Sequence, residues 1–266
     1  MDQENNLPAK AENPPSSEEG RMPLVEHLEE LRFRLIRSLI AIGIGFAIAY
    51  FFADELFHLL TLPIREVSGG KILLIGTGVG EAFFTKIKVA MIAGLFLGSP
   101  AVFYEIWQFV APGLYEGERK MAKPFVFFAT LFFLLGGYFC WAVVFKFGYA
   151  FFLRQYESIE VTPTLRITEY LAFSARLMIA FAVTFEMPIF AYFFTRLGTI
   201  DYKMMLGSWR YAVVAIFVVA GALTPPDMVS MFLLAIPLLL LYGLSIAVSY
   251  VFRLKPGDAV AEAAPS

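Results

Sequence analysis

The sequence predicts an all-α, polytopic membrane protein with six transmembrane helices. The first observation is composition: of 266 residues, 59% are hydrophobic and only 17% are charged, which is too apolar for a water-soluble domain of this length. The second is the length of the apolar runs. About 20 helical residues cross a hydrocarbon core of about 30 Å, and six segments approach that length with few charges.

The first three apolar segments cover about Leu35–Ala53, Phe83–Tyr104 and Pro124–Phe145. The third segment contains no charge at all. Lys86 and Lys88 stand near the start of the second segment, where their aliphatic stems can lie along the helix while the ammonium groups reach the headgroups. All three segments are therefore expected to span the bilayer.

The fourth segment, about Tyr170–Phe194, carries two ionisable residues, Arg176 and Glu186. Glu186 is about nine residues from the inner end, so it is expected roughly 13 Å deep, near the bilayer centre. An ionisable group there costs several kcal/mol unless it faces protein or water. Glu186 is therefore a functional candidate, and the structural alternative is a protonated or internally hydrogen-bonded carboxyl group that orders the bundle.

The fifth and sixth segments lie within Tyr211–Phe252, which is interrupted only around Pro225 and Pro226. Two consecutive prolines remove amide donors and clash with the preceding turn, so they predict a sharp break. The fifth helix then has about 16 residues, or about 24 Å, which is short for a crossing. Both helices of this pair are expected to be short, and the bilayer is expected to thin beside the fifth.

Basic residues predict the orientation. Twelve of those that flank the spans fall on the side of both termini, among them Arg32, Arg119 and Arg253, and seven fall on the other side. Cytoplasmic loops carry the excess of Lys and Arg, so both termini are expected in the cytoplasm. Residues 1–21, rich in Glu, Asn, Pro and Ser, and residues 255–266 are expected to be disordered cytoplasmic tails around a membrane domain of residues 22–254.

Catalytic, cofactor and metal-binding patterns are missing from the sequence. The two histidines, His27 and His58, are expected on opposite faces of the membrane, and the single Cys140 lies in an apolar run. The glycines of residues 76–80 do not follow a strand as a phosphate-binding loop would. An enzyme, a metal and a cofactor are therefore not expected. The pair Gly94 and Gly98 has the spacing that allows close helix approach, with packing inside the chain as its plainer use.

The segment from Met22 to Leu35 places leucines at helical spacing, with charged residues on the remaining faces. It is expected to be an amphipathic helix on the cytoplasmic surface before the first span. Glu30 lies on this helix. One account of Glu30 is a solvated carboxylate paired with Arg34, four residues on, which contributes a few tenths of a kcal/mol.

A resemblance to a known family adds a second account of Glu30. Matching motifs follow in one order over about residues 22–254, and they are residues 23–32 (PLVEHLEELR), Pro63, residues 107–119 (WQFVAPGLYEGER), residues 185–188 (FEMP), residues 223–227 (LTPPD) and residues 234–237 (LAIP). With these motifs the chain resembles the TatC family, the membrane receptor of the twin-arginine protein translocase. The resemblance implies a concave six-helix bundle in the bacterial inner membrane, within an oligomeric complex.

The resemblance also implies a binding site. Glu30 and Glu118 match the two cytoplasmic glutamates that recognise consecutive arginines of a signal peptide in that family. A guanidinium presents a planar fork of donors that fits a carboxylate bidentately, which a lysine ammonium cannot reproduce. Arg32 and Arg119 are expected to orient or neutralise these carboxylates, and Phe109 to contact the peptide. The hydrophobic stretch of the signal peptide is expected to enter a groove between helices.

For Glu186 the resemblance implies contact with a polar residue on the membrane helix of a small partner subunit. The implied partners are TatB-like and TatA-like single-span subunits, which gather around the receptor before the proton-motive force drives folded cargo across. The remaining matched positions have a structural interpretation as loop, turn or kink residues, and they are Pro63, Pro112, Pro188, Pro225, Pro226 and Asp227.

Two other functional classes are alternatives to the receptor. A secondary transporter would use Arg176 and Glu186 as an ion or proton path, but it predicts an internal repeat that this sequence does not show. An intramembrane protease needs a Ser/His or paired Asp arrangement inside the bilayer, and no His or Asp lies in an expected span.

Overall fold

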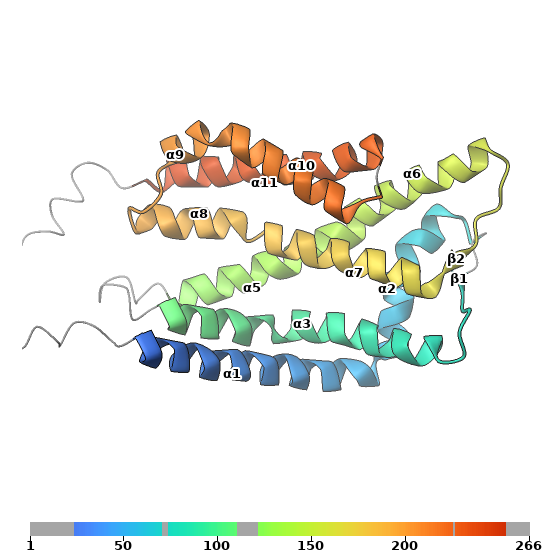
Figure 1. Cartoon of the computed structure of the whole chain (residues 1–266), viewed down its shortest axis with the longest axis horizontal. Coiled ribbons are helices and arrows are strands. Elements are labelled where there is room, and N and C mark those ends of the chain that lie inside the picture. Colours follow the sequence, from blue (N-terminus) through green and yellow to red (C-terminus); the bar gives the residue numbers. More distant parts are fainter. Residues whose placement is uncertain (1–23, 71–73, 111–121, 226, 254–266) are drawn as a thin grey trace, which may run out of the picture.

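The computed structural model describes residues 24–70, 74–110, 122–225 and 227–253 (Figure 1). The tails expected to be disordered, residues 1–21 and 255–266, and also Pro226, lie outside this part of the chain. The described elements are α1 (Leu24–Phe51), α2 (Ala53–Val67), β1 (Leu74–Ile75), α3 (Glu81–Val110), α5 (Ala122–Phe139), the π-helix η2 (Cys140–Val144), α6 (Phe145–Ser158), β2 (Leu165–Arg166), α7 (Ile167–Thr184), α8 (Met187–Arg196), α9 (Tyr202–Gly207), α10 (Trp209–Leu223) and α11 (Met228–Val251).

The long helices lie side by side in one bundle, with α1 against α3, α3 against α5, α5 against α7, and α8 against α11 (Figure 1). We call the end where α1 begins and α11 ends the terminal end, and the end that carries the two strands the sheet end. Among the described residues, five helical segments have the length and hydropathy to cross a membrane, and α10 is a shorter apolar helix. The predicted six-helix membrane fold is confirmed.

The first helix differs from the expectation. It runs unbroken from Leu24 to Phe51, so the separate surface helix expected before the first span is wrong. The reason lies in the sequence: no proline or glycine interrupts the chain between Leu24 and Gly43, and Leu, Glu and Arg are strong helix formers. Glu30 therefore lies on the same continuous helix, α1, that forms the first span.

Small residues set the distance between α1 and α3. A Cβ added to Gly94 would lie 2.5 Å from the amide nitrogen of Phe46, and one added to Gly45 would lie 2.7 Å from the carbonyl oxygen of Gly94. One turn along, a Cβ on Gly98 would meet Ile42 at 3.1 Å. The Gly94 and Gly98 pair thus serves packing inside the chain, where the two backbones approach too closely for any side chain.

The third span is longer than its apolar run. Helix α5 continues through η2 into α6, so the helical segment Lys123–Ser158 has 36 residues, against an expected end at Phe145. Its length is about 54 Å, well above the thickness of the hydrocarbon core. The π-turn lies at the bend from which α6 leaves the bundle toward the sheet end (Figure 1).

The last two helices are joined by the expected turn. Helix α10 has 15 residues, about 22 Å, and is short as expected, whereas α11 has 24 residues and is long enough to cross. Helix α11 continues through Pro237, because neighbouring helices compensate for an interior proline in a membrane bundle. Asp227 caps α11: its Oδ1 accepts a hydrogen bond from the amide of Ser230 at 2.7 Å. Thr224, which precedes Pro225, is extended, as a residue before proline should be.

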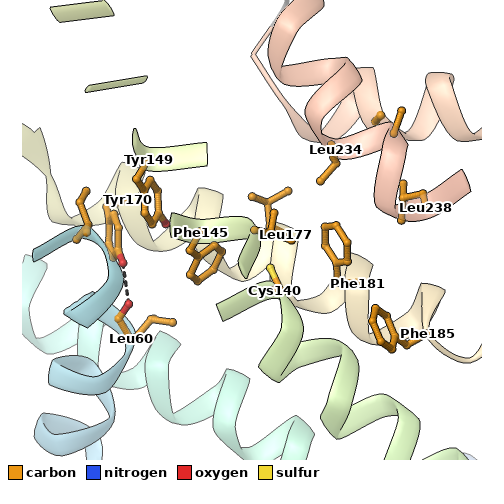
Figure 2. Close-up of a cluster of buried hydrophobic side chains, with 14 of the residues drawn as sticks. Leu60, Cys140, Phe145, Tyr149, Tyr170, Leu177, Phe181, Phe185, Leu234 and Leu238 are labelled. Carbon is orange, nitrogen blue, oxygen red and sulfur yellow. Dashed lines mark hydrogen bonds between the residues drawn. The ribbon is translucent and has the colours of Figure 1, made fainter. Parts of the chain in front are cut away.

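In the described part of the chain, the core consists of two clusters. The larger one joins α2, η2, α6, α7, α10 and α11, and includes Phe145, Phe181 and Leu234 (Figure 2). In this cluster the hydroxyl of Tyr170 donates a hydrogen bond to the carbonyl of Leu60 at 2.7 Å. The smaller cluster lies near the terminal end and centres on Trp107, which is only 2% exposed and is therefore a core residue.

At the sheet end, β1 and β2 pair in parallel, with Leu74 opposite Leu165. Glu81, the first residue of α3, connects the turn after β1 to the start of α7: its carboxylate accepts hydrogen bonds from the amides of Thr77 (2.5 Å), Gly78 (3.1 Å) and Thr168 (3.1 Å). The glycine-rich run of residues 76–80 directly follows β1, so the expectation that no strand precedes it is wrong. It is nevertheless a helix-capping turn, because Glu81 binds its amides. Glu81 occupies amide donors that a phosphate loop would offer to its ligand.

Candidate functional site

A cluster of charged side chains lies where α1 and α3 meet at the terminal end. Nε of Arg34 donates to Oε1 of Glu30 at 3.0 Å, and its Nη2 contacts the same oxygen. Nη1 of Arg34 reaches Oε2 of Glu105 at 3.4 Å, and Nη1 of Arg37 lies 4.0 Å from Oε1 of Glu105. Two carboxylates from different helices therefore share the guanidinium of Arg34.

This cluster is partly shielded from solvent. The side chains of Glu105 and Arg34 are 12% and 16% exposed, that of Glu30 is 27% exposed, and that of Arg37 is 68% exposed. Partial burial strengthens ion pairs relative to those at a fully hydrated surface. Glu30 keeps the more accessible carboxylate of the pair, on the first turns of α1, while Glu105 lies deeper between the helices.

The sequence-predicted residues of this site divide into two groups. Glu30, Arg32 and Phe109 are described, whereas Glu118, Arg119 and Pro112 lie in residues 111–121, outside the described part of the chain. Arg32 is exposed and lies two residues from Glu30, which turns it about 200° around the helix axis. Among the described residues, the guanidinium of Arg34 binds Glu30, as the first account of Glu30 expected.

Phe109 lies on α3 four residues beyond Glu105, so the two share one face of the helix, and Phe109 is half-buried. Glu105 itself is not among the residues predicted from the sequence, because the expected second span ends at Tyr104. Its position gives the cluster a second carboxylate that comes from α3.

The second candidate, Glu186, lies where the fourth span breaks. Pro188 cannot donate an amide hydrogen bond, and the chain leaves α7 after Thr184 and begins α8 at Met187. The amides of Ile189 and Phe190 both bond to the carbonyl of Glu186, at 3.0 Å each. Pro188 thus interrupts the helix within the span and turns the Glu186 side chain into the bundle.

Glu186 is 3% exposed, and neither of its carboxylate oxygens has a hydrogen-bond partner among the described residues. Its neighbour Phe185 packs against the ring of Phe139 at 5.3 Å between centroids. The internally hydrogen-bonded form is thus not seen in the described part of the chain. An unpaired carboxylate in apolar surroundings costs several kcal/mol, which a polar group brought by another subunit would offset.

Arg176 does not pair with Glu186. It lies ten residues earlier, about 15 Å along the helix, on an exposed face, and its Nε donates to the carbonyl of Ala172 at 3.1 Å. The transporter hypothesis used Arg176 and Glu186 as one path. Their separation and opposite burial do not support it.

Among the described residues, two apolar grooves lie between the helices of the bundle. The larger has a volume of about 670 Å³ and is lined by α1, α2, α3, α5, η2 and α7, with Ile48, Phe96 and Trp141 among its walls. The smaller, about 400 Å³, lies between α5, α8 and α11, and Pro188 is among its lining residues. The larger groove shares α1 and α3 with the charged cluster. Its walls are almost entirely apolar, so it suits a hydrophobic segment.

Comparison with known proteins identifies relatives over most of the chain. The family model of the Sec-independent protein translocase protein TatC matches residues 26–237. A TatC from Desulforapulum autotrophicum is 41% identical over 250 residues, which cover 94% of this chain and 92% of the relative. One from Magnetococcus marinus is 42% identical over 229 residues, covering 86% and 84%.

The fold has relatives among solved structures as well. A crystal structure of a twin-arginine translocase receptor, TatC, aligns with a TM-score of 0.77 and 35% sequence identity. The alignment covers 85% of this chain and 99% of that chain. Sequence and fold therefore point to the same family.

Proposed function

This chain belongs to the TatC family of Sec-independent protein translocase proteins, and from that membership we propose that it is the receptor that binds twin-arginine signal peptides. It is a multi-pass protein of the bacterial inner membrane and a component of the twin-arginine translocase. One observation carries the proposal furthest: the carboxylate of Glu30 already binds a guanidinium, that of Arg34, at a partly accessible position.

The contact between Glu30 and Arg34 explains why the signal peptide carries arginines. A guanidinium offers two parallel N–H donors to a carboxylate, whereas a lysine ammonium offers a point charge. Glu30 binds one of the two consecutive arginines, and Glu118 binds the other. Phe109, one turn beyond Glu105 on α3, provides an aromatic surface beside the arginines.

Charge alone does not hold a signal peptide. A partly exposed ion pair contributes about 1 kcal/mol or less, so two of them give little affinity. The hydrophobic stretch of the signal peptide occupies the larger apolar groove, since that groove shares α1 and α3 with Glu30 and Glu105. From Glu30 to Ile48 is 18 residues of α1, about 27 Å, a distance that a helical or extended signal segment spans.

The terminal end of the bundle faces the cytoplasm in this proposal. Arg37, Lys123, Arg196 and Arg253 are exposed at or near that end, as expected for the cytoplasmic side of a membrane protein. Both termini are then cytoplasmic, and the sheet end faces the opposite compartment. Signal peptides, which are made in the cytoplasm, reach Glu30 directly.

Glu186 recruits the small subunits. Its carboxyl group is buried without a partner among the described residues, and a polar residue on the membrane helix of a TatB-like or TatA-like single-span subunit supplies one. The receptor then nucleates an oligomeric assembly. The proton-motive force drives folded cargo through it, and the chain itself works as a binding protein.

A crosslinking experiment tests signal-peptide recognition. The full-length protein is expressed in membranes and exposed to a twin-arginine signal peptide that carries a photo-reactive group beside the arginines. Glu30→Ala and Glu118→Ala should each reduce the crosslink by about fivefold at a peptide concentration below saturation, while membrane insertion is retained. Glu66→Ala, at an ion pair with Lys146 (2.7 Å) near the sheet end, is the control and should crosslink normally. Unchanged crosslinking in both Glu30→Ala and Glu118→Ala contradicts the proposal.

A further inference from the structure

The proposed function uses Glu30 and leaves Glu105 without a role. Yet Arg34 contacts both acids, with Nε on Glu30 at 3.0 Å and Nη1 near Glu105 at 3.4 Å. Arg34 is chemically the same as the side chain that the signal peptide presents. At rest, therefore, an arginine of the chain itself occupies the carboxylate that the peptide's arginine must bind.

Among the described residues of the cluster, Glu30 and Glu105 supply two negative charges, and Arg34 and Arg37 supply two positive ones. The Arg34 side chain is only 16% exposed, so it cannot move into water at little cost when its partner is taken. A second acid within reach is what allows it to give up the first.

We propose that Glu105 is a positioning residue that retains Arg34 when an arginine of the signal peptide takes Glu30, so that Arg34 is exchanged between two carboxylates. This inference rests on the proposed function. Glu105 then acts through Arg34 and does not touch the peptide.

The geometry suits such an exchange. The Arg34 guanidinium already spans both acids, so a rotation of its side chain brings a second N–H onto Glu105 without movement of the backbone. A carboxylate has about four acceptor positions, so Glu105 can accept Arg34 bidentately. Arg37, at 4.0 Å from Glu105 and 68% exposed, is the arginine that can turn into solvent to make room.

The exchange also sharpens selection. A ligand must displace Arg34 from Glu30, and only another guanidinium restores the same forked contact. A lysine that binds Glu30 gains less binding free energy than Arg34 loses when it leaves Glu30. Competition from within the chain thus raises the arginine preference, in the way that a repulsive or competing element adds specificity.

A binding experiment with the full-length protein in lipid nanodiscs tests the exchange. The probes are a fluorescent twin-arginine signal peptide and its twin-lysine counterpart, and the variants are Glu105→Gln, Arg34→Gln, the double variant and Glu66→Gln as a control. Glu105→Gln should weaken binding of the arginine peptide by about fivefold to tenfold, because Arg34 stays on Glu30. The double variant should return to within about twofold of the unmodified protein. Arg34→Gln alone should discriminate less between the two peptides.

Each alternative outcome is distinct. Equal binding of both peptides by the unmodified protein overturns the proposed function and the exchange with it. Clear discrimination with unchanged binding in Glu105→Gln overturns the exchange alone. A loss in Glu105→Gln that the double variant does not restore also overturns it, since Glu105 would then act without Arg34. Should Glu105→Gln not fold, Arg34→Gln decides: weaker binding of the arginine peptide than in the unmodified protein contradicts the exchange.

Discussion

The indole Nε1 of Trp141 donates a hydrogen bond to the carbonyl oxygen of Leu59 at 2.9 Å, from the π-turn η2 to helix α2. In a regular α-helix that carbonyl accepts the amide four residues on, but residue 63 is a proline and has no amide hydrogen. Trp141 therefore supplies the donor that Pro63 lacks. The next carbonyl, of Leu60, is bonded by Tyr170 of α7, so side chains of two other helices hold the Pro63 turn.

Removal of the Trp141 donor should destabilise the protein. Trp141→Phe keeps an aromatic ring at the site but leaves the Leu59 carbonyl without its donor, and we expect a loss of about 1–2 kcal/mol in the free energy of unfolding. Reversible unfolding in mixed detergent micelles measures this loss. Trp209→Phe, at a 50% exposed tryptophan on α10, is the matched control and should change stability by less than about 0.5 kcal/mol.

A double-variant experiment with Pro63→Ala tests whether Trp141 stabilises the protein through its hydrogen bond to Leu59. Pro63→Ala restores an amide opposite the Leu59 carbonyl, so Trp141→Phe should cost less in that background than in the unmodified protein. The same cost in both backgrounds would show that Trp141 stabilises the bundle only through packing.

The close contact of α1 and α3 predicts a second stability effect. A methyl group at Gly94 would lie 2.5 Å from backbone of α1, so Gly94→Ala should force the helices apart and cost about 1–3 kcal/mol. Gly43→Ala, on α1 where an added Cβ meets nothing within 4 Å, should be neutral or slightly stabilising. Thermal unfolding in detergent compares the two variants.

The same substitution should reach the charged cluster. Because Arg34 and Glu105 lie on the two helices that Gly94 joins, Gly94→Ala should also weaken binding of a twin-arginine peptide, while Gly43→Ala should not. Lower stability of Gly94→Ala with normal peptide binding would show that the contact of α1 with α3 at Gly94 does not affect the binding site.

Sequence patterns predicted the six spans because the length of an apolar run is read directly from the chain. They placed the helix ends poorly, since backbone hydrogen bonding does not stop where hydropathy falls. The third segment was expected to end at Phe145 but continues to Ser158, and the first helix begins in the polar turns that carry Glu30. Helix α2, with its interior Pro63, was not expected as a helix at all.

The candidate site was predictable in part. Glu30 is predicted because it lies in the matched motif of residues 23–32. Glu105 lies outside the matched motifs and outside the expected second span. The glycines do carry a signal for Glu105. Gly94 of α3 faces Gly45 of α1. Glu105 lies eleven residues after Gly94 and Arg34 lies eleven residues before Gly45, so the two side chains lie opposite one another. That register becomes visible only when the partner of the glycine pair is known, and no pattern within one segment provides it.

Glu81 should hold the turn after β1 against the start of α7. Its carboxylate accepts the amides of Thr77, Gly78 and Thr168, and Glu81→Gln would turn one acceptor into an amide donor that faces other donors. We expect faster amide hydrogen exchange at residues 77, 78 and 168 in this variant. Glu169→Gln, which loses only an exposed contact with Arg166, should leave those three amides protected, and equal exchange in both variants would contradict the role of Glu81.

Glu186 should lower the stability of the isolated protein but allow it to bind single-span subunits. Its carboxyl group is buried with no hydrogen-bond partner among the described residues, so Glu186→Leu replaces a costly polar group by an apolar one of similar size. The isolated protein should therefore unfold at the same or a higher temperature. Under the proposed function the variant should still bind a twin-arginine peptide but no longer co-purify with single-span subunits, because it has no polar group to offer them.

Glu186→Gln distinguishes charge from hydrogen bonding at this position. A glutamine retains a polar carbonyl oxygen and adds donors, so co-purification retained by Glu186→Gln and lost in Glu186→Leu points to a hydrogen bond with the partner helix. Loss in both variants means that the subunit requires the carboxyl group itself. Full recruitment by Glu186→Leu, with its stability unchanged or raised, would instead leave Glu186 without a role in assembly.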